Sequence, residues 1–249
     1  MKILLITGAT TGIGAALART IPQAGDTVFL HYHANGERCT ALADELKQRG
    51  AVAHTVQADF AADPDGAART LADRMAATAD RLDVLINNAG GIIQRQTVAE
   101  AEYTNTVATI NLNLVAPMML CTYCSPLLDA AVHATGRADV VNISSIAARS
   151  GSPTSTPYGA AKAGLENFTR GFAKEVGPGI RVNTVSPGVI DTPFHHGTTP
   201  SEQMDRWLAA TPVGHHGTPE AIAAAVGFVL ANGFMSGAVV PVNGGIQMI

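Results

Sequence analysis

Hydrophobic positions along the chain follow two patterns that alternate from its beginning to its end. Short runs rich in β-branched residues predict strands, and stretches with apolar residues three and four apart predict helices. The predicted strands are Lys2–Thr7, Thr27–Tyr32, Val52–Gln57, Val84–Asn87, Asp139–Ser144, Arg181–Val185 and Val239–Val242. The clearest predicted helices are Ile13–Ala24, Glu37–Arg49, Asp65–Ala79, Tyr103–Ala131, Tyr158–Val176 and Pro219–Ala231. This alternation indicates βαβ units and a parallel sheet, hence the α/β fold class.

One stretch, residues 187–219, breaks the alternation because it is rich in Pro, Gly and His. No internal repeat, linker or low-complexity tract is found, so we predict a single domain over residues 1–249. A chain of 249 residues that is 47% hydrophobic can bury one large core. Long loops on a rigid sheet often carry function, which makes 187–219 a candidate functional segment.

The first predicted strand runs directly into a glycine-rich turn. In ILLITGATTGIG, Gly8, Gly12 and Gly14 lie between an apolar run and a helix start. This arrangement holds a pyrophosphate on backbone N–H groups, and a Cβ would obstruct the tight turn. Such a turn can also be purely structural, but its place in a strand–turn–helix unit favours dinucleotide binding.

Ser145, Tyr158 and Lys162 form a set suited to proton transfer. In YGAAK the Tyr and Lys stand at i and i+4, one above the other on a helical face. An ammonium beside a phenol favours the phenolate, so we expect the pKa of Tyr158 to fall below its reference of about 10. Ser145 follows an apolar run, and the adjacent Ser144 is the alternative candidate for the serine of this set. Alone, this Tyr–Lys spacing is also found on ordinary solvated helix faces.

Charge and hydropathy exclude several classes of partner. The net charge is −4, and Lys and Arg are scattered without a tract, so nothing predicts binding to nucleic acid or anionic lipid. The apolar stretch Ala221–Leu230 is too short to span a bilayer. We therefore predict neither a nucleic-acid nor a membrane partner, and a cytoplasmic location.

Cysteine and histidine usage predicts neither disulfides nor a metal site. Three cysteines are an odd count without a disulfide framework, and Cys121 and Cys124 lie in an apolar helical pattern that favours packing. Adjacent residues rarely face one ion, so substrate-loop or solvent roles are favoured over metal binding for the pairs His195-His196 and His215-His216.

Taken together, the motifs resemble the short-chain dehydrogenase/reductase family over essentially the whole chain. They are TGATTGIG (Thr7–Gly14), Asp59, NNAG (Asn87–Gly90), Asn111, Ser145, Tyr158, Lys162, SPGVIDT (Ser186–Thr192) and VNGG (Val242–Gly245). The resemblance implies a single-domain Rossmann-type doubly wound parallel sheet of about seven strands, with helices on both faces. It also implies that residues 187–219 cover the substrate.

The resemblance assigns a set of cofactor-binding residues. Asp59 matches the position that accepts a hydrogen bond from adenine, although it can also be read as a loop cap. The full set is Gly8, Thr11, Gly12, Ile13, Gly14, Tyr32, His33, Asp59, Asn87, Ala89, Gly90, Tyr158, Lys162, Pro187, Gly188, Val189 and Thr192.

Cofactor preference depends on the end of the second predicted strand. NAD-preferring relatives carry an acid there, whereas this chain has Tyr32 followed by His33, and His33, Asn35 or Arg38 could donate to a 2′-phosphate. Against this, Thr11 stands where NADP-binding relatives often have Arg or Lys. The sequence favours NADP(H) slightly over NAD(H), and use of both stays open.

The resemblance implies hydride transfer between the nicotinamide and a carbonyl or carbinol carbon. Tyr158 would exchange the proton, Ser145 would stabilise the substrate oxygen and Lys162 would support the phenol and the ribose. Asn111 matches the family asparagine that kinks its helix and holds a proton-relay water. Two alternatives belong to other classes: a non-catalytic cofactor-binding sensor, and an epimerase or lyase.

Polar side chains beside the predicted reacting carbon favour a small polar carbonyl substrate, such as a sugar-derived keto acid or ketose. The candidate substrate residues are Arg95, Arg149, His195 and His196. The rival substrate is a 3-oxoacyl thioester, and these side chains can also be read as facing water. Relatives associate through the helices predicted at Tyr103–Ala131 and Tyr158–Val176, which implies a homotetramer or a homodimer.

Overall fold

The computed structural model describes residues 1–196 and 199–248, and within them seven strands form one all-parallel sheet. Its order is β3-β2-β1-β4-β5-β6-β7. The strands are β1 Ile3–Ile6, β2 Thr27–Tyr32, β3 Val52–Gln57, β4 Val84–Asn87, β5 Ala138–Ile143, β6 Ile180–Pro187 and β7 Val239–Val242. The predicted α/β fold, a Rossmann-type doubly wound parallel sheet, is confirmed.

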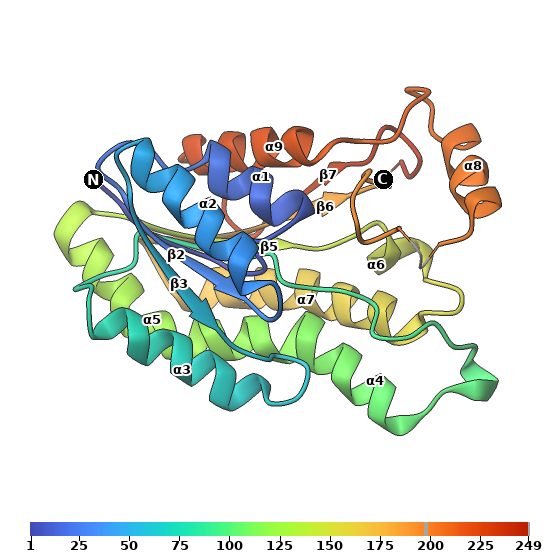
Figure 1. Cartoon of the computed structure of the whole chain (residues 1–249), viewed down its shortest axis with the longest axis horizontal. Helices are drawn as coiled ribbons and strands as arrows, with labels where there is room; N and C mark the ends of the chain where they lie inside the picture. The colour runs from blue at the N-terminus through green and yellow to red at the C-terminus, as the bar shows by residue number, and fades with distance from the viewer. Residues whose placement is uncertain (197–198, 249) are drawn as a thin grey trace.

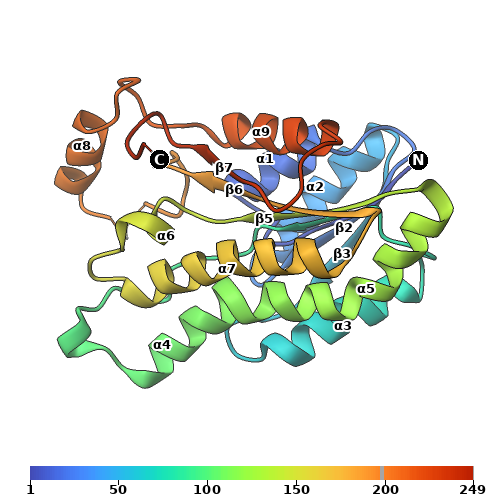
Figure 2. The same cartoon turned by 180° about the vertical axis from the view of Figure 1, so that it is seen from behind.

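Helices cover both faces of this sheet (Figures 1 and 2). One face carries α1 (Gly12–Thr20), α2 (Gly36–Gln48) and α9 (Pro219–Ala231). The other carries α3 (Pro64–Ala76), α4 (Tyr103–Ile110), α5 (Ala116–Thr135) and α7 (Thr156–Glu175). Each layer has its own apolar core, around Leu17 and Val226 on the first face and around Leu71 and Leu128 on the second.

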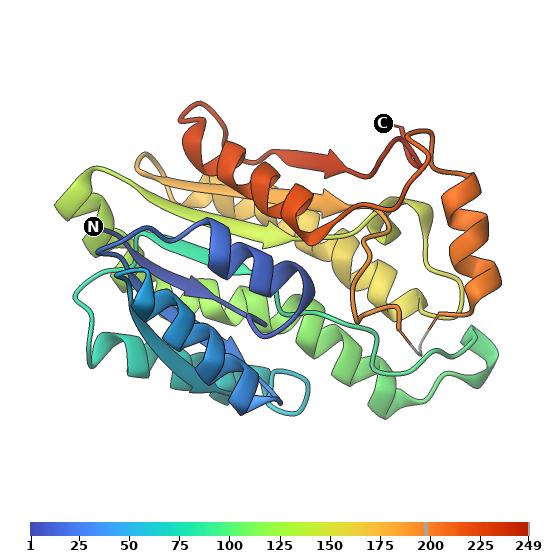
Figure 3. The same ribbon diagram turned by 45° about the horizontal axis from the view of Figure 1, so that its top comes forward.

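The order of the strands determines where a ligand can bind. From β1 the chain builds β2 and β3 to one side, and it then crosses back to place β4 on the other side of β1. Where the winding reverses, the carboxyl ends of the two central strands open a crevice. The arrowheads in Figure 3 all point to this edge, where α8 (Ser201–Ala209) also lies.

Three helices differ from the sequence-based expectation. α1 ends at Thr20 instead of Ala24, because Pro22 has no N–H group with which to continue the helical hydrogen bonds. The predicted helix Tyr103–Ala131 consists of α4, the π-helical turn Asn111–Val115 and α5. Within the stretch 187–219, Ser201–Ala209 is helical, where the sequence suggested only loop.

The continuous helical run Tyr103–Thr135 is long and apolar enough to cross a membrane, judged by length and composition alone. In the structure it is a helix of the core layer. Leu120, Cys124 and Leu128 are buried in the apolar cluster shared with α3 and the sheet. Its apolar character is therefore explained by packing.

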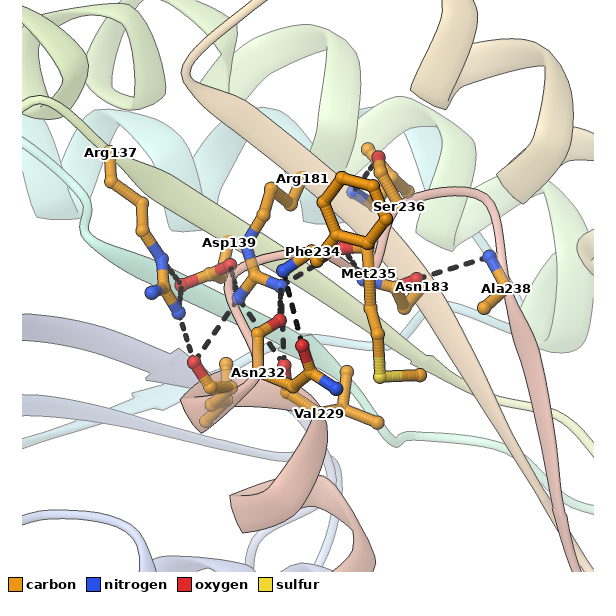
Figure 4. Close-up of polar contacts among 12 residues, drawn as sticks. Arg137, Asp139, Arg181, Asn183, Val229, Asn232, Phe234, Met235, Ser236 and Ala238 are labelled. Carbon is orange, nitrogen blue, oxygen red and sulfur yellow. Dashed lines mark hydrogen bonds and ion pairs between the residues drawn. The ribbon is translucent and has the colours of Figure 1, made fainter.

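Arg181 on β6 joins the end of α9 to the strand that follows it (Figure 4). Its buried guanidinium donates to the carbonyls of Val229, Asn232 and Met235, and it forms an ion pair with Asp139 on β5. A cation is favourable at a helix carboxyl terminus. These contacts hold the chain as it enters β7, whose end then approaches the loop after β6.

Candidate active site

A cleft of about 710 Å3 lies along the carboxyl edge of the sheet. It is lined by the glycine-rich turn, the ends of β2 to β6, α7 and the segment that leads to α8. The predicted cofactor residues that line it are Gly8, Thr11, Gly12, Ile13, Gly14, Tyr32, His33, Asp59, Ala89, Gly90, Tyr158, Lys162, Pro187, Gly188, Val189 and Thr192. The remaining one, Asn87, does not.

The glycine-rich turn uses glycine for two separate reasons. Gly8 and Gly12 have φ values of 63° and 51°, which L side chains rarely adopt. Gly14 is required by contact, because a Cβ there would lie 2.0 Å from the carbonyl oxygen of Gly8. At the N-cap of α1, Thr11 makes no side-chain capping bond. The first N–H groups of α1 therefore face the cleft without a side-chain cap.

Asn88, to which the sequence analysis gave no role, lines the cleft, whereas the predicted cofactor residue Asn87 does not. Asn87 is buried, and its Nδ2 donates to Asn142 Oδ1 at 2.8 Å, which ties β4 to β5 below the cleft. Asn88 lines the cleft and donates to the carbonyls of Thr7 and Gly8. Successive strand residues point to opposite sides, so only one of the pair can support the glycine-rich turn.

His31 is a cleft residue that the sequence analysis missed. Its Nδ1 accepts from the Gly8 N–H at 3.2 Å, so its Nε2 donates to the Ala58 carbonyl at 3.1 Å. Burial lowers the pKa of His31 to about 4, which keeps the ring neutral at pH 7. The only signal in the sequence is a polar residue inside the apolar run of β2. The ring links the glycine-rich turn to the end of β3.

The position of Asp59 is compatible with both roles considered from the sequence, a cap of the loop and a residue of the cofactor site. Its Oδ1 accepts from the N–H groups of Ala61 and Ala62 at 2.9 and 3.2 Å, which caps the loop after β3. Its Oδ2 lies 3.4 Å from Nε2 of His33, and both residues line the cleft. Arg38, by contrast, is not among the residues that line the cleft.

The structure brings Ser145, Tyr158 and Lys162 together on the cleft wall. Ser145 follows β5, and its hydroxyl is hydrogen-bonded to the Tyr158 phenol. Lys162, one turn along α7, is buried, and its Nζ donates to the Ile143 carbonyl at 2.8 Å. Ser144 is turned away, since its hydroxyl donates to Glu166 Oε1 at 3.1 Å.

The expected fall in the pKa of Tyr158 is wrong for this structure. Burial raises the pKa of Tyr158, while the hydrogen bond from Ser145 and the positive charge of Arg95 act in the opposite direction. Nζ of Lys162 lies 5.7 Å from the centre of the phenol ring, and burial lowers the pKa of Lys162 itself to about 8. The cation that acts on the phenol is therefore Arg95.

Neither Asn111 nor Asn113 is among the residues that line the cleft, but Asn113 lies beside Lys162. Nδ2 of Asn111 donates to the Ala61 carbonyl at 3.1 Å, away from Lys162. Asn113 is fully buried, and its Oδ1 accepts from the Gly91 N–H at 3.0 Å. A Cβ on Gly90 would lie 2.8 Å from Asn113 Oδ1 and 3.0 Å from Lys162 Nζ, so these two groups converge.

The π-helical turn explains how Asn113 reaches this position. Its Nδ2 donates to the carbonyl of Thr109 at 2.8 Å and to that of Gly91 at 2.7 Å. The first bond takes a carbonyl that an α-helix would pair with a backbone N–H. Single-turn π segments are frequent at functional sites. The helix is irregular from Asn111 onward, where the resemblance placed the kink, and Asn113 provides side-chain hydrogen bonds within this turn.

Two of the four candidate substrate residues line the cleft, and two do not. Arg95 and His195 face the cleft near Tyr158, together with the apolar side chains of Phe194 and Trp207. Arg149 instead donates from Nε to Glu166 Oε2 at 3.5 Å, and His196 lies on the surface 3.5 Å from Asp191. The buried Glu166 carboxylate explains the orientation of Arg149.

Comparison with known proteins supports the same conclusion as the geometry. Residues 8–247 match a family model described as enoyl-(acyl carrier protein) reductase. The chain is 35% identical to cis-4-hydroxycyclohexanecarboxylate dehydrogenase of Sinomonas cyclohexanicum, covering 100% of this chain and 97% of that protein. It is 34% identical to the 3-oxoacyl-(acyl-carrier-protein) reductase of Pseudomonas aeruginosa, covering 99% and 98%.

Solved structures agree over the full fold. An NADH-dependent reductase responsible for alginate metabolism superposes with a TM-score of 0.89 at 30% identity, covering 100% of this chain and 98% of that one. The Pseudomonas aeruginosa RhlG/NADP complex gives 0.88 at 30% identity, covering 99% and 96%. The chain belongs to the short-chain dehydrogenase/reductase family and is an NAD(P)-dependent oxidoreductase that acts on CH–OH groups.

Proposed function

We propose that the protein interconverts a ketone and a secondary alcohol on a small polar substrate, such as a sugar-derived keto acid or a ketose. The observation that carries this proposal is Tyr158, which is hydrogen-bonded to Ser145 in a cleft that continues into the glycine-rich turn. A phenol and a hydroxyl at one point of such a cleft suit a single substrate oxygen.

The cleft fits a nicotinamide cofactor. The uncapped first turn of α1 offers N–H groups to a pyrophosphate, and Asp59 stands at the adenine end. Lys162 would hold the ribose, and Val189 and Thr192 would contact the carboxamide, as the family resemblance implies. When bound, the cofactor supplies or accepts the hydride.

Protons are handled by the residues of the chain itself. Tyr158 would protonate the carbonyl oxygen during reduction and take the proton back during oxidation. Ser145 would donate to the same oxygen and stabilise the charge that develops there. Lys162 and Asn113, which converge beside Gly90, would supply the path by which the phenol is reprotonated. Asn113 replaces Asn111 in this proposal.

Two relatives support a substrate with a carboxylate. One is named for a hydroxycyclohexanecarboxylate, and a reductase of alginate metabolism has nearly the same fold. Other findings favour a second candidate, a 3-oxoacyl thioester, because the matching family model and a 34% identical relative carry acyl-carrier-protein names. Phe194, Trp207 and Ile92 in the cleft wall would suit an acyl chain.

A substrate panel tests the proposed function. We expect keto acids and ketoses to oxidise NADPH with a higher kcat/KM than an acetoacetyl thioester, because the cleft near Tyr158 holds the polar side chains of Arg95 and His195. The rate is followed by the absorbance of the reduced nicotinamide. An advantage of about tenfold or more for the thioester, equal to about 1.4 kcal/mol, would overturn this choice of substrate.

For the cofactor, we expect a higher kcat/KM with NADPH than with NADH. The end of β2 presents Tyr32 and His33 to the cleft and no carboxylate that would repel a 2′-phosphate. The change Tyr32→Asp should reverse the order, because an acid there accepts from a ribose 2′-OH and repels the phosphate. Steady-state kinetics with both cofactors decide this, and a wild-type preference for NADH would contradict the prediction.

The proposal also includes the location of the protein, the role of residues 187–219 and the oligomeric state. Residues 1–249 act as one cytoplasmic domain, and 187–219 cover the substrate, apart from residues 197–198, which lie outside the described part of the chain. A homotetramer is supported by exposed apolar side chains in two parts of the chain, Tyr103 and Met118 on α4 and α5, and Phe228 and Phe234 on and after α9. A tetramer with two-fold axes needs more than one interface. A monomer in light scattering at micromolar concentration would contradict it.

A further inference from the structure

The end of the cleft where Tyr158 lies carries a fixed positive charge. Arg95 lies in the loop after β4 and faces the cleft. Its position is electrostatically close to the phenol, since its charge and the ionisation of Tyr158 influence one another. A cation this near the reacting atoms will act on whatever substrate binds there.

The scaffold holds this guanidinium from two sides. NH1 donates to Oγ of Ser155 at 3.1 Å, and Ser155 is buried at the start of α7. The backbone is also anchored, because the Gln96 N–H donates to the Thr154 carbonyl at 2.8 Å. On the other side, NH2 donates to Oγ1 of Thr199 at 3.1 Å, just before α8. Arg95 thus joins the rigid wall to the cover segment.

His195 adds polarity to this corner without adding charge. Its Nδ1 lies 3.1 Å from Oγ1 of Thr199, and its ring packs edge-on against Trp207 and Phe194. Burial, together with the nearby charge of Arg95, lowers the pKa of His195 to about 4. His195 is therefore neutral at pH 7 and can serve as a hydrogen-bonding partner only.

The charges along the cleft are distributed unevenly. Among the described residues that line it, Asp59 is the only carboxylate, and it follows β3 at the adenine end. Two strands, β2 and β1, separate β3 from β4, which leads to Arg95. Arg95 and Lys162 are the cations of the cleft, and both lie at the reacting end.

We infer that Arg95 binds a carboxylate of the substrate, which makes the substrate a keto acid or hydroxy acid. A guanidinium presents a planar fork of N–H donors that matches the two oxygens of a carboxylate. Thr199 and His195 complete the polar surface around it. This inference rests on the proposed carbonyl chemistry at Tyr158, and it separates acids from neutral ketoses and thioesters.

A bound carboxylate would also contact both sides of the cleft at Arg95. The fork of Arg95 already contacts Thr199, so an anion seated there meets groups from both the wall and the segment before α8. A neutral substrate gains no charge-assisted contact in the same place. This difference in binding free energy would make the protein prefer substrates with a carboxylate over neutral ones.

The test compares acids with their esters. Keto acids with one to about four bonds between carbonyl and carboxylate are each assayed beside the methyl ester. We expect wild-type kcat/KM to favour at least one acid over its ester by about 10- to 100-fold. Arg95→Gln should bring this ratio close to one, and Arg95→Lys should give an intermediate ratio. The ratio cancels any general effect of the change on Tyr158.

A matched control is Arg206→Gln, which removes an exposed cation from α8 that does not line the cleft. Its acid-to-ester ratio should equal that of the wild type. Equal turnover of acids and esters by the wild type, or an acid preference that survives in Arg95→Gln, would overturn the inference. Thermal melts of each variant establish that the proteins compared are folded.

Calorimetry separates this inference from the proposed function. Binding of the same acids and esters is measured with NADP+ present, so that no carbonyl is reduced. Absence of turnover with every compound would contradict the proposed function alone. Tighter binding of acid than of ester, lost in Arg95→Gln, would still support the carboxylate site, and equal binding of both would refute it.

Discussion

Tyr158→Phe should lower kcat by about 10²- to 10⁴-fold, the range for loss of a positioned general acid. The change removes one hydroxyl and keeps the ring, which packs 6.1 Å from Phe194. Ser145 and Lys162 keep their bonds to the backbone of Ala147 and Ile143. The loss should therefore appear in the chemical step, with cofactor affinity nearly unchanged.

Single-turnover kinetics and calorimetric titration of NADPH measure these two quantities. Tyr103→Phe provides a matched control, because Tyr103 is 81% exposed on α4 and lies outside the cleft. It should retain the full rate. If Tyr158→Phe kept more than about a tenth of the wild-type rate, a loss of under about 1.4 kcal/mol, Tyr158 would not be the proton donor.

Asn113→Ala should lower stability and turnover more than Asn111→Ala does. The change leaves the Gly91 N–H without its acceptor and frees the carbonyls of Thr109 and Gly91 inside the protein. An unsatisfied buried group costs about 1–3 kcal/mol. A loss of that size in the transition state corresponds to about 10- to 100-fold in rate. Both stability and turnover should fall.

Asn111→Ala is the matched comparison. It removes only the bond from Nδ2 to the Ala61 carbonyl, which is worth about 0.5–1.5 kcal/mol. We expect turnover within about threefold of the wild type, because Asn111 does not line the cleft. Denaturant melts and kcat for both variants decide between them. A larger loss of rate in Asn111→Ala would restore the assignment made from the sequence.

The two asparagines show where sequence reasoning reaches its limit. Both stand in NLNLV, and the family resemblance pointed to Asn111. A helix turns by about 100° per residue, so positions two apart point in nearly opposite directions. Only the packing of the π-helical turn decides that the side chain of Asn113 is the one that meets Gly91 beside Lys162.

The charge near Tyr158 is a second feature that sequence reasoning did not place correctly. In the sequence the visible cation is Lys162, four residues along the same helix. In the structure Lys162 is buried, so its pKa falls to about 8, while Arg95 from the loop after β4 supplies the charge that acts on the phenol. Nζ of Lys162 donates to the Ile143 carbonyl and lies 5.7 Å from the centre of the phenol ring, so the neighbour in sequence is not the cation that lowers the pKa of the phenol.

The sequence by itself determined the α/β fold and most of the cofactor cleft. Apolar runs locate the strands, parallel strands end at one edge, and ligands bind there, so the glycine-rich turn could be placed from the pattern and Asp59 from the family resemblance. Tertiary structure decided which of several adjacent polar residues face the cleft. Asn88 and Arg95 line the cleft, Asn113 is buried against Gly91 behind it, and Arg149 is directed toward Glu166. The physical reason is that the direction of a side chain depends on the rotation of its helix and on buried hydrogen-bond partners, and these partners come from segments far apart in the chain.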